Sequence, residues 1–94
     1  IEAVFFPSDI MSFGALNLLY EKNIEVPQQM SVIGYDGITM GNYSSPALTT
    51  IEQPVQQLAE KSISTLLEII RGEDILSHIK LKPSILPRES VAQK

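Results

Sequence analysis

The feature that most constrains this fold is an apolar run, an amphipathic stretch and a second apolar run, together about 35 residues long. The first run, Glu2–Phe6, is short, β-prone and bounded by Pro7. The second, Val32–Tyr35, reads as a buried strand that stops at a Tyr-Asp-Gly turn. A strand, a helix and a second strand over this length form a parallel unit with a right-handed crossover. The sequence therefore predicts an α/β fold.

The amphipathic stretch is predicted to be a helix from Ser8 or Asp9 to about Lys22, because either side chain can cap its first turn. Asn23 can adopt the left-handed conformation that ends a helix, and Ile24 can fold back over the last turn. The apolar side chains at helical spacing are Ile10, Phe13, Leu16, Leu19 and Tyr20, with Met11, Ala15 and Leu18 beside them. A helix this apolar is expected to be covered on more than one side.

The second half of the chain predicts a loop, an extended segment and another helix. Gly37–Pro46 is polar and rich in turn-forming residues, and Leu48–Ile51 is expected to be extended. The helix is expected to begin at Pro54 and to end at Gly72. Its apolar face consists of Val55, Leu58, Ala59, Ile63, Leu66, Leu67 and Ile70.

The last residues contain a turn and two short segments that can be extended. We expect a surface turn over Glu73–His78 and an edge strand over Ile79–Lys82, where apolar and basic residues alternate. The segment Ser84–Leu86 lies between two prolines, so it can be extended but is not expected to donate fully to a ladder. Residues after Ser90 are expected to form a frayed tail.

Composition excludes several classes of function for these 94 residues. There is no cysteine, which rules out disulfides and thiolate metal sites and is compatible with a reducing cytoplasm. The net charge is −4 and the basic residues are scattered, so this segment is not expected to grip DNA itself. No apolar run is long enough to span a bilayer. Because the chain begins at Ile1 and opens directly on a strand, we expect it to be part of a longer protein.

Signals of catalysis or metal binding are weak. The single histidine, His78, has no partners at ligand spacing and is interpreted as a solvated residue of a turn. Ser8 and Asp9 lack an accompanying base, and helix capping accounts for both. No glycine-rich phosphate loop occurs. We therefore expect neither a catalytic residue, nor a metal site, nor a cofactor.

Asp36 is the strongest candidate for a binding residue. It ends a predicted strand, and open α/β sheets bind ligands at the carboxyl ends of their strands. A carboxylate there can accept hydrogen bonds from sugar hydroxyls or from ring N–H groups. The alternative, that Asp36 merely stabilises the turn with Gly37, stays open.

Three further residues have two interpretations each. Gln53 can hydrogen-bond a ligand or cap the helix that follows it, and its spacing favours the cap. Phe13 and Tyr43 are large residues on either side of the loop region, which suits a core or a subunit interface. Ordinary packing is the simpler interpretation of both.

An ordered series of short motifs carries a family resemblance. The pieces, in chain order, are Ala3-Val4-Phe5, Ser8-Asp9, Gly14-Ala15-Leu16, Val26-Pro27, Ser31-Val32-Ile33-Gly34-Tyr35-Asp36, Pro46-Ala47-Leu48-Thr49-Thr50-Ile51, Gln53-Pro54 and Arg88-Glu89-Ser90. No piece is specific alone, but this order at these separations resembles the effector-binding domain of the lac repressor/galactose repressor (LacI/GalR) family of bacterial transcription regulators.

The resemblance implies a periplasmic-binding-protein-like (type I) α/β domain, in which two lobes flank a cleft and are joined by three crossings. Residues 1–94 would then be the C-terminal portion of the effector-binding and dimerisation domain. They would hold part of the C-terminal lobe, a parallel sheet flanked by helices, and the last two crossings. The helix-turn-helix domain and most of the N-terminal lobe would lie outside this chain.

The resemblance also assigns roles. It places effector contacts at Ser8, Asp36 and Gln53, with Asp9 close by, and dimer contacts at Phe13 and Tyr43. Two departures stand out. Ser8 occupies a position where the family often has Asn. The family often has an acidic residue or Asn where this chain has Gly37, which would leave Asp36 as the only side-chain acceptor of the turn.

The implied function is that of a cytoplasmic, dimeric, non-enzymatic repressor that binds a sugar or sugar derivative in the cleft. Cleft closure would be coupled to DNA affinity through the domain outside this chain. Some relatives respond to a phosphorylated carrier protein, which makes such a protein a further candidate partner. An extracytoplasmic sugar-binding protein of the same fold is the alternative function. An enzyme would need a base or metal set that this chain does not contain.

The resemblance carries one energetic expectation. In the family, the helix after Gln53-Pro54 packs on the N-terminal lobe, so its apolar face would lack a partner here. About 10 kcal/mol of burial is at stake, against a typical domain stability of ~5–15 kcal/mol. We therefore expect the chain alone to be marginally stable or to pair this helix with another copy.

Overall fold

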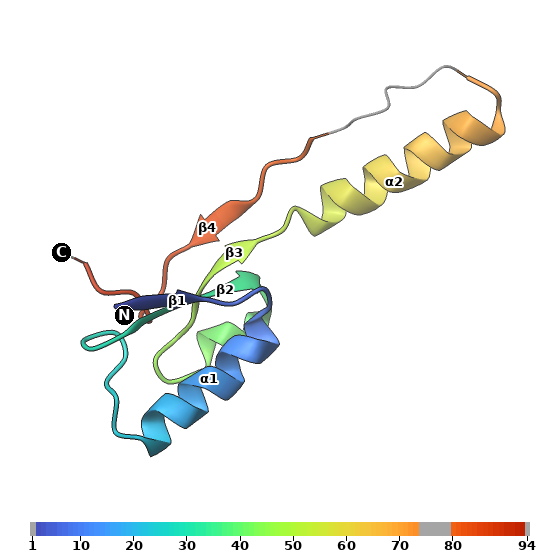
Figure 1. Cartoon of the computed structure of the whole chain (residues 1–94). Coiled ribbons are helices and arrows are strands. Elements are labelled where there is room, and N and C mark those ends of the chain that lie inside the picture. The colour runs from blue at the N-terminus through green and yellow to red at the C-terminus, as the bar shows by residue number, and fades with distance from the viewer. Residues whose placement is uncertain (1, 74–79, 94) are drawn as a thin grey trace. The chain divides into compact units, whose positions relative to one another are not determined.

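The structure, a computed structural model, describes residues 2–73 and 80–93 and contains two compact units (Figure 1). The first unit comprises Ile1–Gln53 and Ser84–Lys94, and the second comprises Pro54–Pro83. His78 and most of the predicted surface turn lie outside the described residues.

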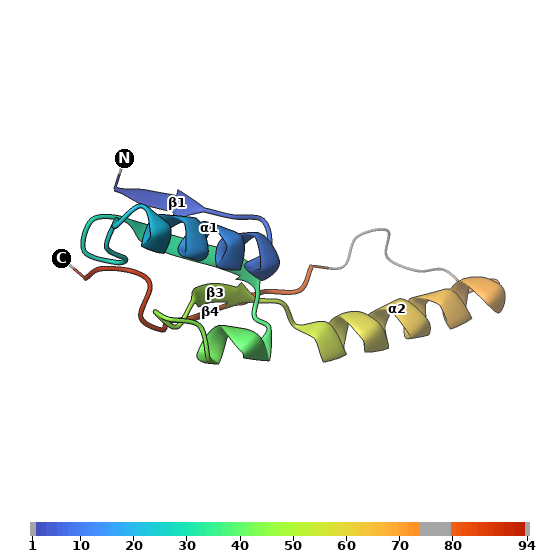
Figure 2. The same ribbon diagram turned by 90° about the horizontal axis from the view of Figure 1, so that it is seen from below.

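A four-stranded sheet forms the centre of the first unit (Figure 2). The strands are β1 (Ala3–Phe5), β2 (Ser31–Asp36), β3 (Thr49–Glu52) and β4 (Ser84–Leu86), and they lie in this order across the sheet. The first three run parallel, whereas β4 pairs antiparallel with β3. The predicted α/β class and the parallel strand–helix–strand unit are therefore confirmed.

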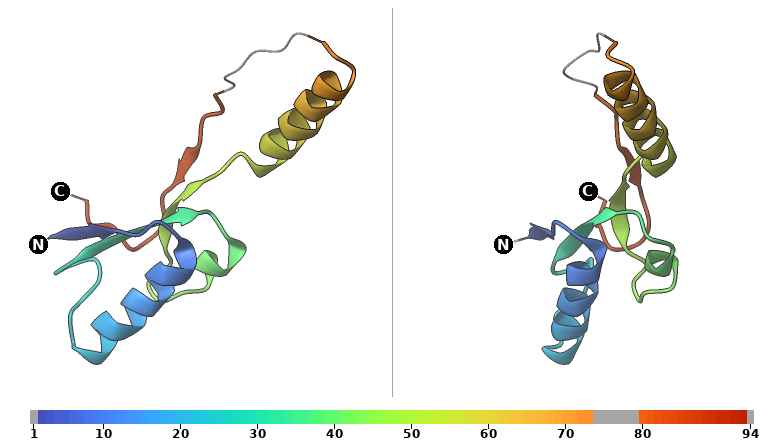
Figure 3. Two further views of the ribbon diagram at one scale, coloured as in Figure 1. Left: turned by 45° about the vertical axis from the view of Figure 1, so that its right-hand side comes forward. Right: turned by 90° about the vertical axis from the view of Figure 1, so that its right-hand side faces the viewer.

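The helix α1 (Asp9–Glu21) connects the first two strands and packs on β2 (Figure 3). Ser8 is its N-cap, and the Ser8 hydroxyl oxygen accepts from the Met11 N–H at 3.2 Å. At the other end Asn23 has a φ of 60°, and the Ile24 N–H donates back to the Leu19 carbonyl oxygen at 2.9 Å. Both predicted helix ends are thus confirmed, because capping depends on neighbouring residues alone.

A small core lies between this helix and the sheet. Leu16, Val32 and Leu48 are buried at its centre, and the partly buried side chains around them are Val4, Phe6, Phe13, Leu19 and Val26. The rest of the apolar stripe on α1 is exposed in this chain, with Ile10, Met11, Leu18 and Tyr20 each at least half accessible. The expectation that α1 is covered on more than one side is therefore not met within the described residues.

The opposite face of the sheet is also apolar. Phe5 pairs with Ile33, and Ile51 pairs with Ile85, which places these four side chains on the face away from the core. Phe5 and Ile85 are more than half exposed. Among the described residues of the first unit, a helix covers only one face of the sheet.

The segment between β2 and β3 is more ordered than predicted. A short 3₁₀ helix, η1 (Thr39–Asn42), lies within the expected polar loop. The Leu48 N–H then donates to the Gly41 carbonyl oxygen at 2.9 Å, so the loop returns directly to the start of β3.

The prediction of the last strand was wrong. Lys80–Lys82 forms no strand, and the pairing segment is β4, between the two prolines. Pro83 and Pro87 flank these three residues without interrupting them, so the N–H groups of β4 remain free to pair. The prediction was based on the alternation of apolar and basic residues over Ile79–Lys82. Which segment becomes a strand depends instead on pairing with β3.

The expected frayed tail after Ser90 is hydrogen-bonded to the sheet at Ala92. Ser90 is fully buried, and the Ala92 N–H donates to the Ser31 hydroxyl oxygen at 2.9 Å. Ser90 also links β2 to β3 near their amino ends, since its hydroxyl donates to the Val32 carbonyl oxygen and accepts from the Thr49 N–H at 2.8 Å.

The second unit contains the helix α2 (Val55–Ile70). Pro54 is its N-cap and Gly72 follows it with a φ of 75°, close to the predicted bounds. None of its residues is buried. No helix within the described ranges is long and apolar enough to cross a membrane.

Candidate functional site

The carboxyl ends of the parallel strands bring the candidate residues to one edge of the sheet. Ser8 follows β1, Asp36 ends β2 and Gln53 follows β3. Parallel strands end at the same edge, which is where open α/β sheets bind their ligands. All three side chains are half-buried, so each retains accessible surface.

Asp36 and Gln53 are in direct contact. The Gln53 side-chain Nε2 donates to Asp36 Oδ1 at 2.7 Å. The alternative in which Gln53 caps the next helix is wrong, because the N-cap of α2 is Pro54 and no side-chain capping bond is present. Among the described residues, no donor reaches the other carboxylate oxygen of Asp36, Oδ2, which leaves it available to accept.

The backbone of Asp36 is strained. Its φ is +133°, a value that side chains of L-residues rarely tolerate. Such residues cost of the order of 1–3 kcal/mol and persist only where the surroundings hold them. They cluster at functional sites, which supports a binding role for this side chain.

The next residue has no room for a side chain. Gly37 has a φ of 77°, and a Cβ there would lie 2.9 Å from both the Cα and the Cβ of Glu52. The turn therefore requires glycine in this conformation, which accounts for the absence of a second acidic residue at this position.

Asp9 supplies the acceptor for the turn instead. Its carboxylate is fully buried, and Oδ2 accepts from the backbone N–H groups of Gly37 at 3.0 Å and Ile38 at 2.9 Å. Its other oxygen, Oδ1, accepts from the Thr50 hydroxyl at 2.6 Å. Asp36 is therefore not the only side-chain acceptor near the turn, and Gly37 is held by Asp9 and not by Asp36.

This burial changes the interpretation of Asp9. The family resemblance placed Asp9 with the residues expected to bind the effector, but its carboxylate is buried and accepts from three donors of this chain. It has no accessible surface through which a ligand could be contacted. Asp9 is therefore not retained as a contact residue.

The sequence did contain a signal of this arrangement. A Cβ on Gly34, in the middle of β2, would lie 2.3 Å from Asp9 Oδ1 and 2.9 Å from the Ser12 hydroxyl oxygen. Glycine inside a strand often marks the close approach of another group. The identity of the approaching group, however, could not be read from the sequence.

The Ser8 hydroxyl can still donate a hydrogen bond while it caps α1. Its oxygen accepts from the Met11 N–H, but within the described part of the chain its O–H donates to no partner. A serine hydroxyl can donate and accept at once. Ser8 can therefore still donate to a ligand oxygen.

Phe13 and Tyr43 lie together on a different surface. They line a groove of about 420 Å³, with Leu16, Asn17, Tyr20, Met40, Ser44 and Ser45 as its other lining residues. Phe13 is half-buried and packs on the core, whereas Tyr43 is 81% exposed. The groove is mostly apolar and is suited to a macromolecular contact.

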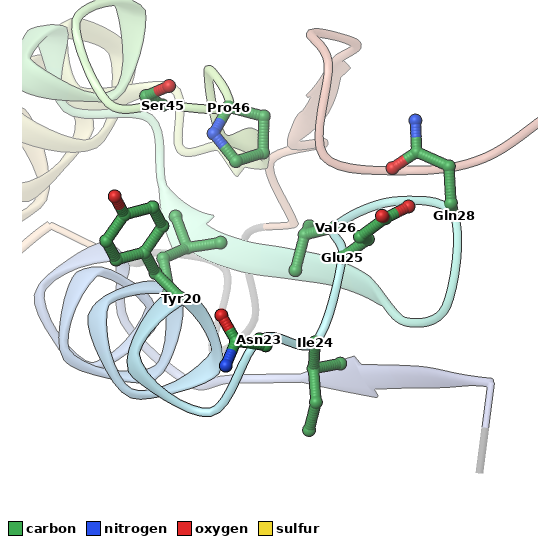
Figure 4. Close-up of a pocket in the computed structure, with 9 residues that line it drawn as sticks. Tyr20, Asn23, Ile24, Glu25, Val26, Gln28, Ser45 and Pro46 are labelled. Carbon is green, nitrogen blue, oxygen red and sulfur yellow. The ribbon is translucent and has the colours of Figure 1, made fainter.

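A second groove of about 340 Å³ continues along the end of α1 (Figure 4). It shares Leu16, Tyr20 and Ser45 with the first and extends to Val26 and Pro46. Neither groove is lined by Asp36 or Gln53. These two grooves are thus separate from the polar edge of the sheet.

No metal centre is found in the described residues, where no group of three or more His, Cys, Asp and Glu side chains converges. His78, which was predicted to be a solvated residue of a turn, lies outside the described residues. The described polar edge holds a carboxylate, an amide and a hydroxyl, which are groups that can hydrogen-bond to neutral polar molecules.

The chain is similar to a known domain family and to known transcription repressors. The periplasmic binding protein-like domain matches residues 2–91. The HTH-type transcriptional repressor PurR of Yersinia enterocolitica is 43% identical over 91 residues, which cover 96% of this chain and 27% of the relative. The chain thus spans about a quarter of the length of this curated relative.

Two solved structures are similar over almost the whole chain. One is a periplasmic binding protein/LacI transcriptional regulator from Alkaliphilus metalliredigens complexed with D-xylulofuranose, with 30% identity and a TM-score of 0.87. The other is the lac repressor dimer bound to operator and an anti-inducer, with 28% identity and a TM-score of 0.91. Each covers 98% of this chain, which spans 35% and 32% of them respectively.

Proposed function

Since this chain belongs to the periplasmic binding protein-like domain family and, within it, to the LacI/GalR regulators, we propose that it is the ligand-sensing part of a sugar-responsive transcription repressor. Residues 1–94 form the C-terminal portion of the sensor domain. The rest of the ligand cleft and the DNA-binding domain belong to other parts of the protein.

The observation that carries this proposal is the state of the Asp36 carboxylate. One oxygen is oriented by Gln53 Nε2, the other has no donor among the described residues, and the backbone that presents them is strained. A structural carboxylate would instead be enclosed and saturated, as Asp9 is. Asp36 is thus arranged to accept a hydrogen bond from a molecule outside this chain.

The chemistry of this edge suits a sugar. A sugar hydroxyl both donates and accepts, and adjacent hydroxyls need donors and acceptors side by side. Asp36 Oδ2 accepts, the Ser8 hydroxyl donates, and Gln53 has both an amide oxygen and a second amide hydrogen. A similar solved protein holds a pentulose, which agrees with this class of ligand.

The apolar groove is proposed to be the dimer contact, centred on Phe13 and Tyr43. A similar protein is a dimer on its operator. Because the chain itself is acidic, DNA would be bound by the DNA-binding domain outside it. Ligand binding closes the cleft, and closure changes DNA affinity in the cytoplasm.

Calorimetry on the full-length protein tests the ligand site. The probes are D-xylulose, D-ribose and D-glucose, with adenine as a non-sugar that offers ring N–H donors. We expect at least one of the sugars to bind, and Asp36→Asn to weaken it by at least about tenfold, since a hydrogen bond to a charged acceptor is lost.

The control variant is Ser90→Ala, which removes a buried hydroxyl at the opposite ends of the strands. It is expected to bind the sugar as the wild type does. Equal sugar affinity in the wild type and Asp36→Asn would refute the proposed site. Binding of adenine with no binding of the sugars would refute the ligand class.

A further inference from the structure

We propose that Asp9 is a positioning residue for the ligand site, acting on Asp36 through the backbone of the Gly37–Ile38 turn. This inference rests on the proposed function. Its starting point is that a fully buried carboxylate, with no route to a ligand, is attached to the one turn that carries the candidate binding residue.

The hydrogen bonds fix the peptide group directly after Asp36. The Gly37 N–H is shared between Asp9 Oδ2 at 3.0 Å and the Thr50 hydroxyl oxygen at 3.3 Å. The next N–H, of Ile38, donates to the same Asp9 oxygen at 2.9 Å. Because Gly37 N belongs to the same planar peptide as the Asp36 carbonyl, these bonds restrict the rotation that follows Asp36.

Asp36 needs such a restraint. A non-glycine residue with a φ of +133° relaxes to a commoner conformation unless neighbouring groups hold it. Relaxation would turn the side chain and separate its carboxylate from Gln53. Asp9 and Thr50 therefore set the direction in which the Asp36 carboxylate points.

The rest of the first unit shows that joining β2 and β3 does not require a charge. At the amino ends of these strands, the neutral hydroxyl of Ser90 makes the link. At the carboxyl ends a carboxylate is buried, although burial of a charge is costly unless it is fully hydrogen-bonded. Gly34 must also remain without a side chain to admit Asp9. This charged link occurs beside the candidate binding residue.

A double-mutant cycle on the full-length protein tests the inference, with binding of D-xylulose, D-ribose and D-glucose measured by calorimetry. Asp9→Asn is the informative variant, because its amide oxygen can still accept from Gly37 and Ile38 while its NH₂ group donates to Thr50. The atoms keep their places, but the charge-assisted bonds become neutral and the Thr50 O–H loses Asp9 Oδ1 as its acceptor. We expect sugar binding to weaken about tenfold.

The dependence on Asp36 separates positioning from general destabilisation. In an Asp36→Asn background, Asp9→Asn is expected to cause no further loss of affinity, although it lowers the unfolding midpoint in both backgrounds. Ser90→Ala is the matched control, which lowers the unfolding midpoint and leaves sugar affinity unchanged. Thr50→Val keeps the Asp9 carboxylate and removes one partner, so we expect a smaller loss, about threefold, with the same dependence on Asp36.

The outcomes distinguish the two hypotheses. If Asp36→Asn binds sugar as the wild type does, the proposed function fails, and the inference fails with it. If Asp36→Asn is weakened but Asp9→Asn and Thr50→Val bind normally, only the positioning role is refuted. An equal loss from Asp9→Asn in both backgrounds also refutes it. If Asp9→Asn does not fold, the result for Thr50→Val decides.

Discussion

Substitution of Asp36 by glycine and by alanine separates the strain of the site from its binding role. Both substitutions remove the carboxylate and its 2.7 Å bond with Gln53. They differ by one Cβ methyl group, which makes a φ of +133° unfavourable for alanine, whereas glycine accepts it without penalty. The difference in stability between the two variants therefore measures the strain that Asp36 holds.

The size of this difference follows from two opposing quantities. Relief of a strained φ contributes about 1–3 kcal/mol in favour of glycine. The greater freedom of glycine in the unfolded chain costs about 0.5–1 kcal/mol. We therefore expect Asp36→Gly to have a free energy of unfolding about 1 kcal/mol higher than that of Asp36→Ala. Neither variant should bind the sugar with measurable affinity.

Urea unfolding of the full-length protein, followed by circular dichroism, provides the stability measurement, and calorimetry provides the affinity. A normal residue shows the opposite order, because glycine is usually the less stable choice. Equal stabilities, or a more stable alanine variant, would refute the strain argument. Retained sugar binding by Asp36→Gly would refute the role of the carboxylate.

Three further outcomes are expected. Gly34→Ala should destabilise the protein by about 1–3 kcal/mol, because the new Cβ would meet Asp9, whereas Gly14→Ala, with nothing within 4 Å, should be neutral or stabilising; equal unfolding midpoints would contradict this. Tyr43→Asp should weaken self-association at least about tenfold in analytical ultracentrifugation, because it places a charge in the apolar groove, and an unchanged dimer would refute that interface. The 94-residue chain alone should be marginally stable or self-associate through α2, and a concentration-independent monomer that melts cooperatively above ~60 °C would contradict this.

The parts of the fold that were predicted correctly depend on neighbours in the sequence. The capping by Ser8 and the left-handed Asn23 need only the residues of one helix turn. The strand that ends at Asp36 is marked by its own apolar run and the following glycine. These features are determined locally, so a single sequence is sufficient to place them.

The parts that were missed depend on distant residues. The bond between Asp9 and Thr50 joins positions 41 apart, and the bond between Ser90 and Val32 joins positions 58 apart. No periodicity signals such pairs. The strand β4 was missed for the same reason, since its pairing with β3 outweighs the prolines beside it. The motif around Asp36 placed it at the polar edge, but its strain and its contact with Gln53 required the structure.

Ser90 bridges β2 and β3 but follows both strands in the sequence, which has a consequence for synthesis of the protein. A ribosome adds about 5–20 residues per second, so Ser90 is added roughly two to eight seconds after β3 is complete. During that interval the nascent sheet lacks its antiparallel edge strand and the hydroxyl bridge between β2 and β3. The residues proposed to recognise a ligand are therefore translated before β4 and Ser90, which complete the sheet that supports them.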